Sequence, residues 1–295
     1  MTNPTILVTG ASGKLGRETL DFLLAAGKDP ARIIATTRDV TKLAGYAEKG
    51  VVVRQADFNA PETLGPAFAG AERVAIISTD AVAPGTDRVA QHSAAVDAAK
   101  AAGARHIIYT SLPNPEDSLI SFAGDHLGSE KAVKDSGLGY TILRNTWYQE
   151  NLLMSLPQAL EHGVIMSAAG QGKLSYVAHE DCARALAAAL LAETDESAIY
   201  TLVGPEGHTI DDVAALAREF SGKPLAVQHV DSATLRKTLE GVGLPPFLVD
   251  MLVSTDDNIR AGNFDIVNDD FERLTGRKPK PLSSFFEDNR EALSA

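Results

Sequence analysis

The sequence contains one cysteine, Cys182, and no apolar run long enough to cross a bilayer among its 295 residues. A lone cysteine excludes a disulfide within the chain, which is typical of proteins from reducing compartments. The start of the chain, Met1–Pro4, lacks the basic and then apolar pattern of a secretory leader. We therefore expect a cytoplasmic protein that has no membrane partner.

Positive charge is also scarce. The chain has 27 lysines and arginines against 39 aspartates and glutamates, a net charge of -12. Because lysine and arginine supply most of the affinity for phosphate backbones, this balance excludes non-specific nucleic-acid binding. The seven histidines show no close metal-ligand spacing, so we expect no metal site. A Walker lysine and a Gly-x-Ser-x-Gly elbow are likewise missing.

The most informative stretch comes directly after the apolar run Thr5–Val8. Glycines follow at positions 10, 13 and 16, and then a helical pattern begins. In a dinucleotide-binding loop Gly10 would permit the tight turn, Gly13 would let backbone N–H groups approach a pyrophosphate, and Gly16 would let helix and strand pack closely. A plain glycine turn is the alternative. The flanking strand and helix favour a dinucleotide site.

Strand and helix patterns alternate from Thr5 to Ser111, which predicts an α/β protein with a doubly wound parallel sheet, the NAD(P)-binding Rossmann fold. We assign residues 1–150 to this domain and expect residues 174–204 to return to it. Residues 151–173 and 205–295 are less regular and predict a smaller α/β lobe that binds the substrate.

Polar residues follow the expected strands at their carboxyl ends, where such sheets bind ligands. Arg38 closes the second strand, where an arginine accommodates a 2′-phosphate and favours NADP(H); Asp39 beside it keeps NAD, or a solvated surface pair, as alternatives. Asp57 is a candidate for the adenine amino group or, equally, a turn residue. Ser78 and Thr79 end the fourth strand, where the nicotinamide half would lie.

The usual acid–base group of short-chain dehydrogenases is missing. Their Tyr-x-x-x-Lys pair places both groups on one helix face, and the cation lowers the pKa of the tyrosine. No tyrosine in this sequence has a lysine four residues later, and Leu127 stands where the tyrosine partner of Lys131 belongs. Lys131 could contact the nicotinamide ribose or assist a proton, or it is an ordinary solvated lysine beside Glu130. Ser111 finishes the fifth strand on the cofactor side.

An unusual stretch, Asn145–Asn151, follows the sixth strand and contains the only tryptophan. Aromatic rings more often serve packing, but Trp147 and Tyr148 beside the amide of Asn145 favour a flat, partly polar ligand pocket. Without an acid–base tyrosine, hydride transfer needs an acceptor that requires little acid catalysis. A quinone or an apolar cationic dye meets this condition.

Together with Tyr109–Leu112 and Glu130–Lys131, the glycine loop and the Asn-x-Trp-Tyr-x-Glu-Asn stretch resemble the NmrA-like atypical short-chain dehydrogenases, in particular members that reduce quinones and triphenylmethane dyes. The resemblance implies an NADP(H) cofactor, an aromatic or quinone acceptor, Lys131 near the nicotinamide, and an acceptor site at Asn145, Trp147 and Tyr148. The residues that it implies for cofactor binding are Gly10, Ser12, Gly13, Lys14, Leu15, Arg38, Asp57, Ser78 and Thr79.

The resemblance leaves two questions open. The same group includes redox-sensing regulators that bind NADP without catalysis, so a regulator is the alternative to an enzyme. The second question concerns subunits: the apolar C-terminal tail, which includes Phe264, Phe271, Phe285 and Phe286, could cover the substrate crevice or pack on a second copy in a homodimer.

Overall fold

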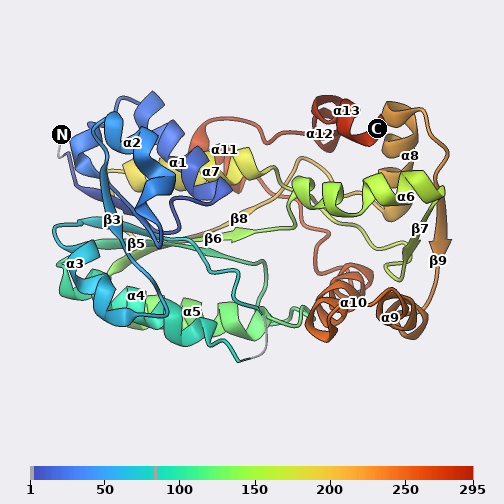
Figure 1. The fold of residues 1–295 in the computed structure, drawn as a ribbon, viewed down its shortest axis with the longest axis horizontal. Helices are drawn as coiled ribbons and strands as arrows, with labels where there is room; N and C mark the ends of the chain where they lie inside the picture. Colours follow the sequence, from blue (N-terminus) through green and yellow to red (C-terminus); the bar gives the residue numbers. More distant parts are fainter. Residues whose placement is uncertain (1–2, 83–84, 295) are drawn as a thin grey trace. The chain divides into compact units, whose positions relative to one another are not determined.

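The structure is a computed structural model that describes residues 3–82 and 85–294. The chain forms two compact units, and each unit is built from separate stretches of sequence (Figure 1). Unit 1 comprises Met1–Ser111, Asp125–Arg144 and Cys182–Tyr200, and unit 2 comprises Leu112–Gly124, Asn145–Asp181 and Thr201–Ala295. The assignment of one lobe to the cofactor and the other to the acceptor stays a prediction.

The main sheet has seven strands in the order β3-β2-β1-β4-β5-β6-β8. The strands are β1 (Ile6–Val8), β2 (Ile33–Thr37), β3 (Val52–Gln55), β4 (Arg73–Ile76), β5 (His106–Ser111), β6 (Gly139–Asn145) and β8 (Ala198–Leu202). β1 pairs in parallel with both β2 and β4, with Ile6 opposite Ile33 on one side and opposite Arg73 on the other. The strand order therefore reverses beside β1, which is the switch point where doubly wound sheets bind ligands.

The central strands are buried because helices cover both faces of the sheet. All the residues of β1, β2, β4 and β5 are buried. Figure 1 shows α1 (Lys14–Ala25), α2 (Ala44–Glu48) and α7 (His179–Leu191) on one face, and α3 (Leu64–Phe68), α4 (Arg88–Ala101) and α5 (Ala123–Asp135) on the other. Short 3-10 helices precede β2, α2 and α3, at Pro30–Arg32 (η1), Val40–Leu43 (η2) and Pro61–Thr63 (η3). The predicted Rossmann fold is confirmed.

Unit 2 contains a two-stranded parallel sheet and several helices. The sheet pairs β7 (Val164–Ser167) with β9 (Ala226–His229). The helices are η4 (Gln149–Met154), α6 (Leu156–His162), α8 (Ile210–Ser221), α9 (Ser232–Gly241), α10 (Pro246–Arg260), α11 (Asp270–Thr275), α12 (Leu282–Asp288) and α13 (Arg290–Ser294). Thr209 begins α8 with a complete capping box, in which Thr209 and Asp212 exchange side-chain and backbone hydrogen bonds.

The sequence pattern predicts one helix over residues 152–161, but the structure has two helical segments there. The 3-10 helix η4 ends at Met154, and α6 begins at Leu156 with Pro157 in its first turn. Proline has no N–H and its ring clashes with the preceding turn, so it is tolerated at a helix start and not in a helix interior. Pro157 therefore marks a new helix start.

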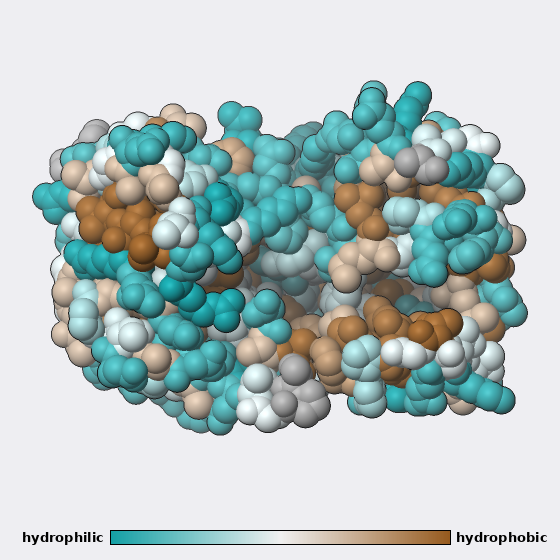
Figure 2. Space-filling view, viewed as in Figure 1, coloured by the Kyte–Doolittle hydropathy of each residue, from teal (hydrophilic) through white to brown (hydrophobic). Residues whose placement is uncertain are grey.

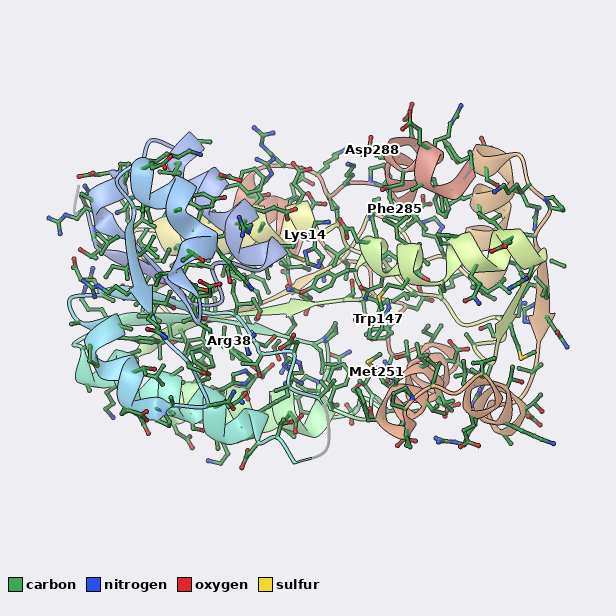
Figure 3. The ribbon with its side chains drawn as sticks, viewed as in Figure 1. Lys14, Arg38, Trp147, Met251, Phe285 and Asp288 are labelled. Atoms are coloured by element: carbon green, nitrogen blue, oxygen red, sulfur yellow. The ribbon has the colours of Figure 1, made fainter. Side chains whose placement is uncertain are left out.

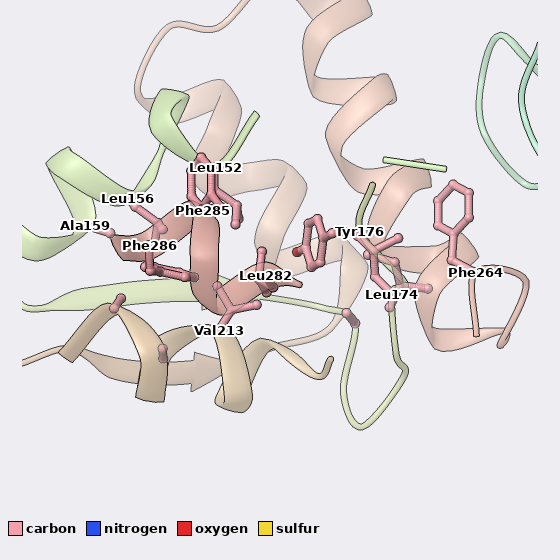
Figure 4. Close-up of a cluster of buried hydrophobic side chains, with 14 of the residues drawn as sticks. Leu152, Leu156, Ala159, Leu174, Tyr176, Val213, Phe264, Leu282, Phe285 and Phe286 are labelled. Carbon is pink, nitrogen blue, oxygen red and sulfur yellow. The ribbon is translucent and has the colours of Figure 1, made fainter. Parts of the chain in front are cut away.

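The C-terminal phenylalanines fill the core of unit 2. Phe264, Phe285 and Phe286 are buried with Leu156 and Val213 (Figure 4). They do not lie exposed as a cover or a subunit contact. A second, smaller apolar cluster lies between β7, α9 and α10, and Figure 2 shows hydrophobic residues gathered on the surface over α9 and α10.

Replacing Phe286 by alanine should destabilise unit 2 severely. The side chain is fully buried, stacks on Phe220 at 6.0 Å and meets Phe285 edge-on at 5.4 Å. We expect Phe286→Ala to lower the free energy of unfolding by about 3–5 kcal/mol, measured by urea denaturation. Val267→Ala, at a valine that is 71% exposed, is the control and should change it by less than about 0.5 kcal/mol. A loss below about 1 kcal/mol for Phe286→Ala would contradict the packing described.

Candidate functional site

The loop between β1 and α1 makes a tight turn in which backbone atoms approach one another closely. Gly10 has φ +58°, in the left-handed region, and its carbonyl accepts a hydrogen bond from Gly13 N–H at 2.9 Å. A Cβ at Gly16 would stand 2.6 Å from Gly10 O and from Ala11 Cα. No side chain at position 16 fits that space, so only glycine lets α1 begin so close to the end of β1.

The N-terminus of α1 is left open by its own sequence. Gly13 is the N-cap, it provides no side-chain cap, and the first turn holds no acidic residue. The first N–H groups of a helix have no partner within the helix, and they carry partial positive charge. This end of α1 is therefore suited to an anion such as a pyrophosphate.

Polar side chains tie the glycine loop to the segment after β2. Thr37 Oγ1 donates to Ser12 Oγ at 2.8 Å. Arg17 donates from Nε to the carbonyl of Ser12 and from Nη2 to the carbonyl of Lys42, both at 2.9 Å. These hydrogen bonds attach the glycine loop to the end of β2 and to the segment after it. Arg17 carries no special spacing in the sequence, which is why sequence reasoning missed it.

The two charged residues after β2 have different partners. The Asp39 carboxylate accepts hydrogen bonds from Thr41 Oγ1 at 2.6 Å and Thr41 N–H at 3.1 Å, so it caps η2. Those hydrogen bonds hold the pKa of Asp39 below its usual value. Arg38 is exposed (Figure 3), and within residues 3–82 and 85–294 no carboxylate forms an ion pair with it. The guanidinium is therefore available to a phosphate, while the carboxylate is engaged locally.

Asp57 closes a turn after β3. Its Oδ1 accepts from Asn59 N–H at 2.9 Å, and its own N–H donates to Thr63 Oγ1 at 2.9 Å. This is the pattern of an Asx turn. Asp57 therefore has the turn role that the sequence allowed, and its contact with adenine stays a prediction.

The segment after β4 is held by residues that the sequence did not single out. Ser78 N–H donates to Thr110 Oγ1 at 2.8 Å. Thr79 N–H donates to His92 Nε2 at 3.0 Å, and Thr79 Oγ1 donates to Gln91 Oε1 at 2.9 Å. Gln91 and His92 share the buried face of α4 with Ala95 and Ala99. The sequence signal that could have identified Gln91 and His92 is their polar character at core positions of an alanine-rich helix.

A buried carboxylate lies beneath the end of β5. Glu130 accepts from Ser111 Oγ at 2.8 Å, from Arg144 Nε and Nη2 at 2.9 and 2.8 Å, and from Lys134 Nζ at 2.9 Å. Burial alone would raise the pKa of Glu130, but these hydrogen bonds together hold it below its usual value. Ser111, predicted on the cofactor side, donates its hydroxyl proton to Glu130 and keeps lone pairs to accept a further hydrogen bond.

Lys131 lies on the opposite, solvent-facing side of α5. Its side chain is 74% exposed and pairs with Asp135 one turn on. Leu127, one turn earlier, is also exposed, whereas His126 and Glu130 are buried. Leu127 and Lys131 therefore lie on one face of α5, as the tyrosine and lysine of a Tyr-x-x-x-Lys pair would. A contact between Lys131 and nicotinamide stays a prediction.

The predicted acceptor residues belong to unit 2. Asn145 Nδ2 donates to Tyr148 Oη at 3.1 Å, and the Tyr148 ring lies 4.1 Å from that of His179. Trp147, half-buried, is 6.5 Å from Phe264 (Figure 3). Asn145 Oδ1 is buried and has no hydrogen-bond partner in the part of the chain that the structure describes. A buried acceptor without a donor is costly, so a ligand N–H or O–H would be favoured there.

The described residues contain neither a metal site nor a membrane-spanning helix. Within the described residues no group of three or more His, Cys, Asp or Glu side chains could hold a metal ion. The same residues include no helix that is long and apolar enough to cross a membrane.

Comparison with known proteins assigns the family. The model of the NmrA-like family matches residues 2–265. The chain belongs to the NmrA-like family. The predicted resemblance is thereby confirmed. The chain is 39% identical to quinone oxidoreductase 2 of Escherichia coli over 251 residues, which cover 85% of this chain and 86% of the relative.

Solved structures agree with this assignment. An NADPH-dependent quinone oxidoreductase of Escherichia coli, complexed with NADPH, has a TM-score of 0.90 and 36% identity, and the match covers 96% of this chain and 99% of that one. Triphenylmethane reductase of Citrobacter sp. has a TM-score of 0.88 and 33% identity over 97% and 99% of the two chains. The negative transcriptional regulator NmrA is 18% identical with a TM-score of 0.78, so it shows the fold alone.

Removing the charge of Glu130 should destabilise this NmrA-like chain in a pH-dependent way. We expect Glu130→Gln to cost about 3–5 kcal/mol at pH 7, because Arg144 would lose its buried partner. The lowered pKa means that the carboxylate stabilises the fold above its ordinary pKa of 4.5 and that this contribution is lost as the pH falls through the lower folded value.

The difference between wild type and Glu130→Gln should therefore shrink below about pH 4.5. Thermal unfolding between pH 7 and pH 3 measures it, with Glu116→Gln, at an exposed loop glutamate, as control. A difference that stays constant over this range would contradict the assignment.

Proposed function

We propose that this protein is an NADPH-dependent oxidoreductase that transfers a hydride from NADPH to a quinone-like or aromatic dye-like acceptor. The observation that carries the proposal is the likeness over nearly the whole chain, at 33–39% identity, to proteins named as quinone oxidoreductase and triphenylmethane reductase. The exposed Arg38 and the open N-terminus of α1 support NADPH in particular.

The residues present fit this cofactor. The positive φ of Gly10 and the space that a Cβ at Gly16 would fill make a backbone cradle at the start of α1. Arg38, which is exposed, offers its guanidinium to the 2′-phosphate. The residues that we propose to hold the cofactor are Gly10, Ser12, Gly13, Lys14, Leu15, Gly16, Arg38, Asp57, Ser78, Thr79, Ser111 and Lys131. When bound, NADPH supplies the hydride.

The acid–base requirements of the reaction limit the acceptor. Tyr109 is fully buried, and burial raises its pKa, so it is not a proton donor to a ligand. Leu127 stands at the tyrosine position of the usual pair. Lys131 is exposed, so either its ammonium or water from the solvent can deliver the proton. A quinone suits such a site, because its reduced oxygen is stabilised by resonance and needs no strong acid.

We assign the acceptor to Asn145, Trp147 and Tyr148. The half-buried rings of Trp147 and Tyr148 offer apolar faces, and the unpartnered Asn145 Oδ1 offers one hydrogen-bond acceptor. Aromatic faces with a few polar groups are typical of small-molecule sites. This combination favours a flat aromatic acceptor over a sugar, which would need more polar partners.

The regulator alternative has weaker support. Its structural counterpart is 18% identical, which supports a common fold and no more. A protein partner that binds equally with and without NADP(H) would also count against a redox sensor. A cytoplasmic location and a homodimer remain predictions, which cell fractionation and analytical ultracentrifugation would test.

Steady-state oxidation of NADPH tests the proposed activity. The assay follows absorbance with a series of benzoquinones and naphthoquinones, with a triphenylmethane dye as second acceptor class. We expect saturable turnover that falls when NADH replaces NADPH. Turnover no faster than the uncatalysed reaction with every acceptor would overturn the proposal.

Arg38→Asp should weaken the preference for NADPH over NADH. The substitution removes a charge-assisted hydrogen bond to the 2′-phosphate, and bonds of this kind contribute about 1.5–3 kcal/mol. We expect the NADPH-to-NADH ratio of kcat/KM to fall by about 10- to 100-fold. Arg32→Asp is the matched control, because Arg32 is exposed at the amino end of the same strand and donates to Thr5 Oγ1. An unchanged ratio for Arg38→Asp would refute its assignment.

Lys131→Met tests the proposed contact with the nicotinamide ribose. Losing that contact should raise the KM for NADPH several-fold. With a quinone, kcat should fall by less than about 100-fold, because water can replace the ammonium as proton donor. Lys100→Met, at an exposed lysine in the last turn of α4, is the control. Wild-type KM and kcat in Lys131→Met would show that Lys131 is only a solvated lysine.

A further inference from the structure

Unit 1 contains a buried chain of hydrogen bonds that ends on the segment after β4. His92, Tyr109, His126 and Ser129, here named the histidine network, are all buried. His92 Nδ1 lies 2.7 Å from Ser129 Oγ, and Tyr109 Oη lies 3.0 Å from His126 Nδ1. The rings of His92 and Tyr109 meet edge-on at 5.3 Å.

The two ends of the network determine where its protons lie. Thr79 N–H can only donate, so His92 Nε2 is an acceptor and His92 carries its proton on Nδ1. The Arg88 guanidinium, 3.3 Å from His126 Nε2, can also only donate, so His126 likewise carries its proton on Nδ1. Ser129 Oγ accepts from His92 and donates to the carbonyl of Asp125 at 2.7 Å.

Both histidines are therefore neutral acceptors at Nε2. Burial, followed by the nearby Arg88 charge, lowers the pKa of His92 to about 3. The same causes hold the pKa of His126 well below its usual value. The hydrogen bond from Thr79 to His92 thus persists through neutral and mildly acidic pH.

The neighbouring residue on α4 holds the same segment from a second side. Gln91 Oε1 accepts from Thr79 Oγ1 at 2.9 Å, and Gln91 Nε2 donates to Asn59 Oδ1 at 2.8 Å. Asn59 belongs to the turn that Asp57 closes after β3. Helix α4 is therefore hydrogen-bonded both to the segment after β4 and to the turn after β3. The proposed cofactor site includes residues from both segments.

We propose that His92 is a positioning residue for the cofactor. Its Nε2 fixes the peptide of Thr79, so that the segment Ser78–Thr79 is held in its cofactor-binding form before NADPH arrives. This inference rests on the proposed function, since it takes Ser78 and Thr79 as cofactor contacts. His92 does not touch the cofactor itself; it acts through Thr79.

Two substitutions separate this role from packing. In His92→Gln the amide oxygen can reach the place of Nε2, so the acceptor for Thr79 N–H is kept. In His92→Asn the shorter amide reaches only the place of Nδ1, which faces Ser129. Both variants remove the ring, so a purely structural role predicts similar losses for both. A positioning role predicts that Gln rescues and Asn does not.

Two measurements read out the difference without turnover. The first is the Kd for NADPH, from fluorescence titration. We expect His92→Gln to stay within about threefold of wild type and His92→Asn to bind about tenfold or more weakly. The second is hydrogen exchange of the Thr79 amide in the cofactor-free protein, which should stay slow in His92→Gln and become fast in His92→Asn.

Tyr109→Phe is the matched control. It removes the hydroxyl that lies 3.0 Å from His126 Nδ1 and 3.4 Å from His92 Nδ1, and it leaves the hydrogen bond from Thr79 to His92 in place. It should lower the melting temperature and leave the Kd for NADPH within about threefold. Equal Kd values for Gln, Asn and wild type would overturn the inference while the proposed cofactor stands. Equal weakening in Gln and Asn would also overturn it. A wild-type protein that does not bind NADPH would overturn the proposed function, and this inference with it.

Discussion

The close backbone approach between β1 and α1 is the constraint on which the rest of unit 1 depends. A Cβ at position 16 would stand 2.6 Å from the carbonyl oxygen of Gly10, so only glycine lets the first turn of α1 pack this close to the loop. The hydrogen bonds from Thr37 and Arg17 then attach the end of β2 to the same loop. The N-terminus of α1 and the segment that carries Arg38 are thereby linked.

Beneath this edge of the sheet, buried polar groups replace the acid–base pair of ordinary short-chain dehydrogenases. Glu130 is saturated by Ser111, Arg144 and Lys134, and Tyr109 is bonded to His126. Neither group is available to protonate a ligand. These hydrogen bonds hold β5 and α5 together.

Much of this arrangement follows from local sequence pattern. The glycine spacing and the β-branched strands predict elements that the structure contains, because each depends on neighbours within a few residues. Arg38 and Asp39 show the limit. The pattern places both at the end of β2, but only the structure shows that Asp39 caps η2 and that Arg38 stays exposed. His92 was missed because its partner, Thr79, is thirteen residues away and no local periodicity reports such a pair.

The sequence by itself determined the fold class and the family, since strand and helix periods and the glycine loop depend on short-range sterics that one chain displays directly. Tertiary structure decided which polar side chains are hydrogen-bonded within the protein and which stay exposed to solvent. It buried Phe285 and Phe286 in unit 2 and left Lys131 in solvent, because burial depends on contacts between elements that are distant in sequence. The groups that a ligand can reach are set by these tertiary contacts.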